Sequence, residues 1–75
     1  MAKNYKVTNS FENDERNKCV DIIQSLEGAY RFQEWRRDAE DIHGWFLLQD
    51  SLPLTFVTES EAVLSATEFV SWFKR

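Results

Sequence analysis

The sequence predicts a small α+β domain in which a three-stranded antiparallel sheet packs on two helices, in the order α-β-β-β-α. Two segments, 13–27 and 58–75, carry apolar residues at the spacing of a helix. Between them, short apolar runs rich in aromatic residues are bounded by turn residues, as in strands. The chain has 75 residues, which is enough for one domain. An alternative arrangement with three helices and a β-hairpin stays open.

The first ten residues are polar and precede the single domain, which we place at 11–75. Tyr5 and Val7 alternate with polar residues, and this alternation is typical of a strand with one exposed face. The pattern is short, so residues 1–10 are predicted to be either a short edge strand or a loose tail.

The segment 13–27 is expected to form the first helix. Four of its apolar residues recur at i, i+3, i+4 and i+7, which places them on one stripe. These residues are Cys19, Ile22, Ile23 and Leu26. Gly28 follows at the position where a left-handed residue commonly ends a helix.

Residues 29–43 fit either a strand followed by a turn or a third helix. As a strand, Tyr30–Trp35 begins two residues after Gly28; as a helix, the apolar residues form a seam at heptad-like spacing. We favour the strand, because a helix beginning at Ala29 would lack a capping side chain. In addition, a two-stranded hairpin is only marginally stable without a third strand.

A β-hairpin is predicted next, at 45–57. Its arms are the apolar runs Trp45–Gln49 and Leu54–Val57, separated by a turn that contains the only proline of the chain.

The stretch 58–75 is expected to be the second helix. Thr58 and Glu61 have the spacing of a capping box, in which each side chain bonds to the backbone near the other. Apolar residues at helical spacing follow and form a stripe. The members of this stripe are Ala62, Val63, Ala66, Phe69, Val70 and Phe73.

Side chains alternate across a strand, so the sheet should have one face on the helices and one face turned away from them. The side chains expected to face the helices are Phe32, Phe46, Leu48, Leu54 and Phe56. The other face would then carry an aromatic patch with arginines at its rim, and tryptophan and arginine are the residue types most enriched at binding hot spots. The residues expected to bind a partner are Trp35, Arg36, Arg37, Trp45 and Leu47.

This patch indicates a non-catalytic protein-binding module, such as an adaptor, an accessory subunit or an inhibitor of a larger protein machine. The expected partner is another protein, and a second copy of the chain is a further candidate. No apolar run approaches the roughly 18 residues that would span a bilayer. The first residues lack the apolar stretch of a secretory signal. We therefore expect a cytoplasmic protein with no membrane partner.

Catalysis is not expected, because the chain has one cysteine and one histidine. This count excludes a zinc site made of cysteines alone and a multi-histidine metal site. Cys19 lies on the apolar stripe, which predicts a buried, inert thiol. Asp38, Glu40 and Asp41 lack the glycine of a calcium loop and, with His43, are interpreted as a solvated loop. The sequence therefore predicts no enzyme, no metal and no cofactor.

Two alternative functions involve nucleic acid, one by direct binding and one by imitation. The residues that would bind it directly are Arg31, Trp35, Arg36 and Arg37, with the indole as a stacking platform. The net charge of −4 argues against this, because contacts with phosphates dominate such affinity. In the second form, acidic residues on the two predicted helices imitate nucleic acid and block a protein that binds it.

Overall fold

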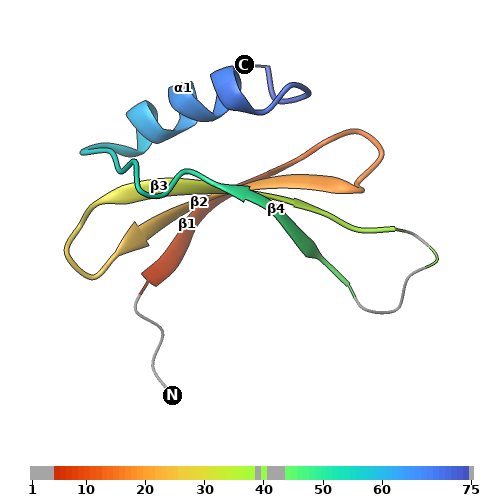
Figure 1. Ribbon diagram of the computed structural model, residues 1–75, viewed down its shortest axis with the longest axis horizontal. Coiled ribbons are helices and arrows are strands. Elements are labelled where there is room, and N and C mark those ends of the chain that lie inside the picture. Colours follow the sequence, from red (N-terminus) through yellow and green to blue (C-terminus); the bar gives the residue numbers. More distant parts are fainter. Residues whose placement is uncertain (1–4, 39, 41–43, 75) are drawn as a thin grey trace.

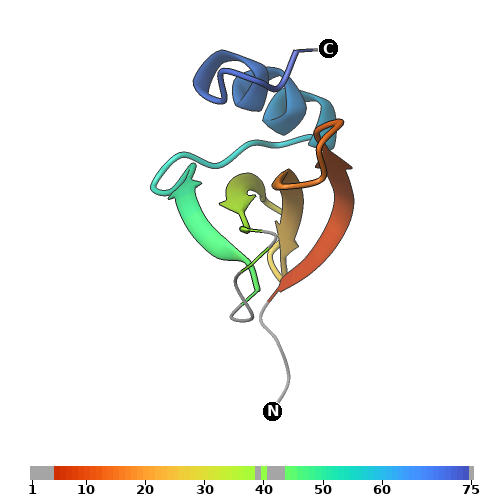
Figure 2. The same ribbon diagram turned by 90° about the vertical axis from the view of Figure 1, so that its right-hand side faces the viewer.

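The computed structural model describes residues 5–38, 40 and 44–74, which form a four-stranded antiparallel sheet with one helix (Figure 1). The elements follow in the order β1 (Tyr5–Glu12), β2 (Lys18–Ser25), β3 (Tyr30–Arg36), β4 (Phe46–Asp50) and α1 (Glu59–Phe69). Each strand pairs with the next one along the chain, so β1 and β4 are the edges of the sheet. Figure 2 shows these two edges on either side, with α1 above them. The predicted α+β class is confirmed, but the described residues contain four strands and one helix.

The N-terminal edge of the sheet is β1, which includes residues 5–10 and continues to Glu12. It pairs with β2 from Tyr5 opposite Ser25 to Glu12 opposite Cys19, and the register shifts by one residue on the way. Residues 1–4 lie outside the described part of the chain.

The predicted helix at 13–27 is wrong, because this segment forms a turn followed by strand β2. Asn13 closes the turn, since its Oδ1 accepts the backbone N–H groups of Asn17 and Lys18, both at 3.0 Å. Arg16 has a φ of 57°, a left-handed conformation that does not occur inside an α-helix. The acidic residues of this segment therefore do not line a helix. The hypothesis that acidic helices imitate nucleic acid loses one of its two predicted helices.

The apolar pattern of β2 explains this error. Cys19, Val20, Ile22 and Ile23 are all buried, so both faces of this central strand are covered. Val20 and Ile22 belong to the core beneath α1, whereas the other two lie on the opposite face because side chains alternate. Two apolar pairs separated by one polar residue fit the period of a helix as well as a strand that is buried on both faces.

The hydrophobic core lies between the sheet and α1. Phe32 on β3 is 2% exposed, and its ring centre lies 6.4 Å from that of Phe56 and 6.3 Å from that of Phe69. The buried residues of α1 itself are two alanines, whose small side chains allow the helix to pack closely on the strands. The buried residues of this core are Val20, Ile22, Phe32, Ala62, Ala66, Val70 and Phe73.

The helix α1 begins as predicted but ends earlier than the sequence indicated. Thr58 is its N-cap, and the Oγ1 of Thr58 accepts the N–H of Glu61 at 3.1 Å. The Glu61 carboxylate in turn accepts the N–H just before the cap, at 3.3 Å. The last helical residue is Phe69, and Val70 is extended. Val70 and Phe73 therefore reach the core from the segment after the helix.

Only the first arm of the predicted hairpin at 45–57 is a strand. It forms β4, which pairs with β3; the chain then turns back, and Phe56 and Tyr30 exchange two backbone hydrogen bonds of 2.8 Å. Ser51 holds the turn, because its Oγ accepts the Phe32 N–H and donates to the carbonyl three residues later. The two predicted arms thus both lie along β3 and do not pair with each other.

The strand β3 confirms the preferred interpretation of its segment over a third helix, and it carries a buried carboxylate. Glu34 is 8% exposed and accepts two hydrogen bonds from neutral donors. Gln49 Nε2 on β4 donates to Oε1 at 2.7 Å, and Trp72 Nε1 after α1 donates to Oε2 at 2.8 Å. Gln49 Nε2 also lies 3.2 Å from the carbonyl of Phe69. These bonds join β3, β4 and the C-terminal segment.

We expect Glu34→Gln to lower the free energy of unfolding by about 1–3 kcal/mol, because an amide leaves one of the two buried donors without an acceptor. Urea denaturation followed by circular dichroism measures the change. Glu68→Gln, at an exposed position of α1, is the matched control and should change stability by less than about 0.5 kcal/mol. Equal stability of Glu34→Gln and the wild type would contradict the structural role of this carboxylate.

Candidate binding surface and pocket

The face of the sheet opposite α1, which we call the open face, is arranged in rows that run across the strands. One row consists of Glu12, Cys19, Trp35 and Leu47, each the register partner of the next. The neighbouring row consists of Ser10, Asp21, Gln33 and Asp50. The first row is therefore acidic at the β1 edge and apolar at the β4 edge.

At the β4 edge, four consecutive large apolar side chains are exposed, from Trp45 to Leu48. Leu47 and Leu48 are 49% and 47% exposed. The register between β3 and β4 shifts within this run, which is the pattern of a β-bulge. We call the set Trp45, Phe46, Leu47 and Leu48, together with Arg36 and Arg37, the β4 surface.

The two arginines of the β4 surface lie on its aromatic rings. The guanidinium carbon of Arg37 is 4.7 Å from the centre of the Trp45 ring, and that of Arg36 is 5.9 Å from the centre of the Phe46 ring. Arg37 Nε also donates to a carbonyl of the β1–β2 turn at 3.0 Å. Arg36 forms an ion pair with Asp38 at 3.1 Å. Both side chains are thus held in place on the surface that they border.

The structure brings together all the residues that the sequence predicted to bind a partner. They are Trp35, Arg36, Arg37, Trp45 and Leu47. Phe46 and Leu48 were missed, because both were expected to face the helices and both are exposed. Only the position of β4 at the edge of the sheet reveals this exposure. Binding of a partner by these residues stays a prediction.

Arg31 does not join the β4 surface. Its Nε lies 3.4 Å from Asp50 Oδ2, and its guanidinium carbon lies 5.4 Å from the centre of the Tyr5 ring. The basic cluster proposed for direct contact with nucleic acid is therefore divided. Two of its charges, on Arg31 and Arg36, are compensated by carboxylates, which weakens any attraction to phosphates.

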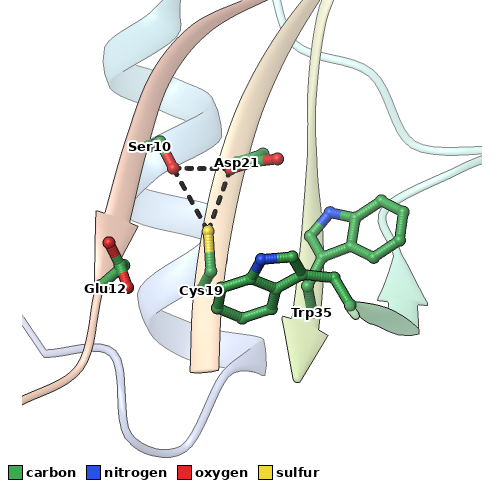
Figure 3. Close-up of a pocket in the computed structure, with 6 residues that line it drawn as sticks. Ser10, Glu12, Cys19, Asp21 and Trp35 are labelled. Atoms are coloured by element: carbon green, nitrogen blue, oxygen red, sulfur yellow. Dashed lines mark hydrogen bonds between the residues drawn. The ribbon is translucent and has the colours of Figure 1, made fainter. Parts of the chain in front are cut away.

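A pocket of about 380 Å³ lies on the open face (Figure 3). It is lined by Ser10, Glu12, Cys19, Asp21, Trp35 and Trp45. Ser10 Oγ and Cys19 Sγ both donate to Asp21 Oδ1, at 2.7 and 3.1 Å, and lie 3.2 Å from each other. Figure 3 shows this triangle joining β1 to β2, with Trp35 on the neighbouring strand.

The hydrogen bonds among Ser10, Cys19 and Asp21 have a structural role, because they link β1 to β2. Burial raises the pKa of the Cys19 thiol from 9.0 to about 11, and the charges of Asp21 and Glu12 act in the same direction. The thiolate is the nucleophilic form, so at neutral pH the thiol is a hydrogen-bond donor. The burial of Cys19 that the sequence predicted is confirmed.

The described residues contain neither a candidate metal cluster nor a membrane-spanning helix. No group of three or more acidic, histidine or cysteine side chains among them is placed to hold a metal ion. Asp38 and Glu40 are exposed, whereas Asp41 and His43 lie outside the described part. No helix in this part of the chain has the length and apolar character needed to cross a membrane.

No protein-family model matches the chain, and no curated protein or solved structure is significantly similar to it. The geometry of the β4 surface and of the pocket is therefore what points to a function.

Cys19 should react slowly with iodoacetamide at pH 8, because a pKa of about 11 leaves about a hundredfold less thiolate than a pKa of 9.0. We expect alkylation of the folded protein to be at least about tenfold slower than alkylation in urea. The rate should rise with pH until the thiol ionises. Mass spectrometry measures both rates, and equal rates at pH 8 would show that the fold does not protect the thiol.

Proposed function

We propose that the protein is a non-catalytic protein-binding module that docks on another protein through its β4 surface. In this role it would serve as an adaptor, an accessory subunit or an inhibitor of a larger protein machine. The observation that carries the proposal is the exposed apolar run from Trp45 to Leu48 on an edge strand. Soluble proteins usually protect such edges with charges, proline or a covering segment, because an open edge can pair with another chain.

Docking would combine backbone pairing with side-chain contacts. Strands β3 and β4 are neighbours, and no other strand of the described chain pairs with the outer side of β4. Alternate backbone groups of an edge strand point outwards and can hydrogen-bond to an incoming strand. The exposed leucines would then be removed from water, which stabilises the complex by about 25 cal/mol per Å² of apolar area.

The arginines of the β4 surface support the same proposal. Arg37 lies over Trp45 and Arg36 over Phe46, so their side chains are ordered before a partner arrives. Ordered side chains lose less conformational entropy on binding than free ones. Their charges at the border of an apolar centre are suited to setting the orientation of a partner.

A charge in the middle of the β4 surface should prevent docking. We expect Leu47→Lys to retain at least about tenfold less partner, because the lysine would be desolvated against an apolar partner surface. The measurement compares the proteins retained by the immobilised wild type and variant from a nuclease-treated lysate, quantified by mass spectrometry. Leu64→Lys is the matched control, because Leu64 is 64% exposed on α1, outside the β4 surface.

Thermal unfolding must show that both variants keep the wild-type fold. Retention of the same protein at the same level by wild type and Leu47→Lys would contradict the proposal, as would an equal loss in Leu64→Lys. Sedimentation equilibrium of the purified protein tests the second-copy alternative. A wild-type dimer that dissociates in Leu47→Lys would identify the chain as its own partner.

A further inference from the structure

The pocket on the open face contains two carboxylates that form no ion pair with a described lysine or arginine. Glu12 and Asp21 both line it. In the described part of the chain, no lysine or arginine nitrogen lies within the 4.0 Å limit for an ion pair of either carboxylate. The side-chain donors to Asp21 are the hydroxyl of Ser10 and the thiol of Cys19, which are both neutral. Two negative charges are therefore available at the pocket for a cation from outside.

Two indoles, those of Trp35 and Trp45, also line the pocket. The Trp45 ring already has the guanidinium of Arg37 at 4.7 Å, so this protein itself shows that a guanidinium stacks on this ring. The Nε1 of Trp35 is buried and donates to no acceptor in the described chain. Because this atom is buried, Trp35 offers the pocket its ring surface and not its N–H group.

We propose that the pocket receives an arginine side chain of the docked partner. A guanidinium is planar, always charged and weakly hydrated, so it stacks on aromatic rings and donates to carboxylates at the same time. Glu12 and Asp21 supply the charge, and the two indoles supply the stacking surfaces. The lysine ammonium is more strongly hydrated and fits such an aromatic pocket less well.

The inference deepens the proposed function and rests on it, since the arginine belongs to the protein that docks on the β4 surface. Trp45 is common to both sites, because it lines the pocket and is part of the β4 surface. A strand on β4 and an arginine in the pocket would therefore contact one continuous area. The volume of about 380 Å³ is sufficient, because ligand pockets measure roughly 300–1,000 Å³.

The test uses the peptide acetyl-Gly-Arg-Gly-amide and its citrulline counterpart, which has nearly the same shape but no charge. NMR of the ¹⁵N-labelled protein follows the three indole N–H signals during titration. We expect the arginine peptide to shift the signals of Trp35 and Trp45, with a dissociation constant of about a few millimolar. Trp72 is an internal control, because its Nε1 donates to Glu34 at 2.8 Å outside the pocket. The citrulline peptide should bind at least about tenfold more weakly.

Two variants remove one pocket charge each while keeping the size of the side chain. Glu12→Gln and Asp21→Asn should each weaken binding of the arginine peptide by about three- to tenfold. Glu27→Gln, in the exposed β2–β3 turn and not among the lining residues, is the matched control and should leave the affinity unchanged. Because Asp21 also holds Ser10 and Cys19, the exposed Glu12 provides the variant whose effect cannot come from a lost structural bond.

The inference is overturned if about 50 mM arginine peptide shifts neither the Trp35 nor the Trp45 signal. It is also overturned if the citrulline peptide binds equally well, or if both Glu12→Gln and Asp21→Asn keep the wild-type affinity. In any of these cases the proposed function still stands when Leu47→Lys loses the partner and Leu64→Lys keeps it. Peptide binding together with unchanged retention by Leu47→Lys would instead show that the pocket is real and the β4 surface is not the docking site.

Discussion

The buried carboxylate of Glu34 is the constraint on which the rest of this structure depends. A carboxylate that is 8% exposed must have its oxygens satisfied by hydrogen bonds. Its donors, Gln49 and Trp72, come from β4 and from the segment after α1, so both elements must lie within hydrogen-bond distance of β3. This requirement holds β4 in register opposite Glu34. It also accounts for the early end of the helix, because the chain must turn back for Trp72 to reach the sheet.

The exposed edge of β4 follows from the same arrangement. One side of β4 is held by β3, and Gln49 is committed to Glu34 and to the carbonyl of Phe69. The helix has 11 residues and packs on β2 and β3, so it does not extend over the far side of β4. Phe46 and Leu48, which are apolar enough for a core, therefore remain exposed. Exposure at this edge is a consequence of the geometry, and it is what makes a docking role the best-supported proposal.

The open face combines a structural network with features that suit a ligand. The bonds among Ser10, Cys19 and Asp21 tie β1 to β2, and the raised pKa of the thiol keeps it a donor at neutral pH. At the same place, two carboxylates without an ion-pair partner among the described residues line a pocket together with two indoles. The hydroxyl of Ser10 and the thiol of Cys19 fix the position of the Asp21 carboxylate, but both are neutral and leave its charge uncompensated. The two faces of the sheet thus differ, since one forms the core and the other presents charge and aromatic surface.

The sequence by itself determined the features that depend on residues close together in the chain. Thr58 and Glu61 predicted the start of α1, and the lack of a capping side chain for a helix at Ala29 favoured the strand that is β3. The proximity of the five residues proposed to bind a partner was predictable in the same way, because they lie in two short segments; their role in binding stays a proposal. The tertiary structure alone decided the conformation of 13–27, since its apolar pairs fit both a helix and a strand covered on both faces. It also decided which side of β4 is exposed. Burial depends on which elements pack together, and a local pattern cannot show whether a strand ends up at the centre or at the edge of a sheet.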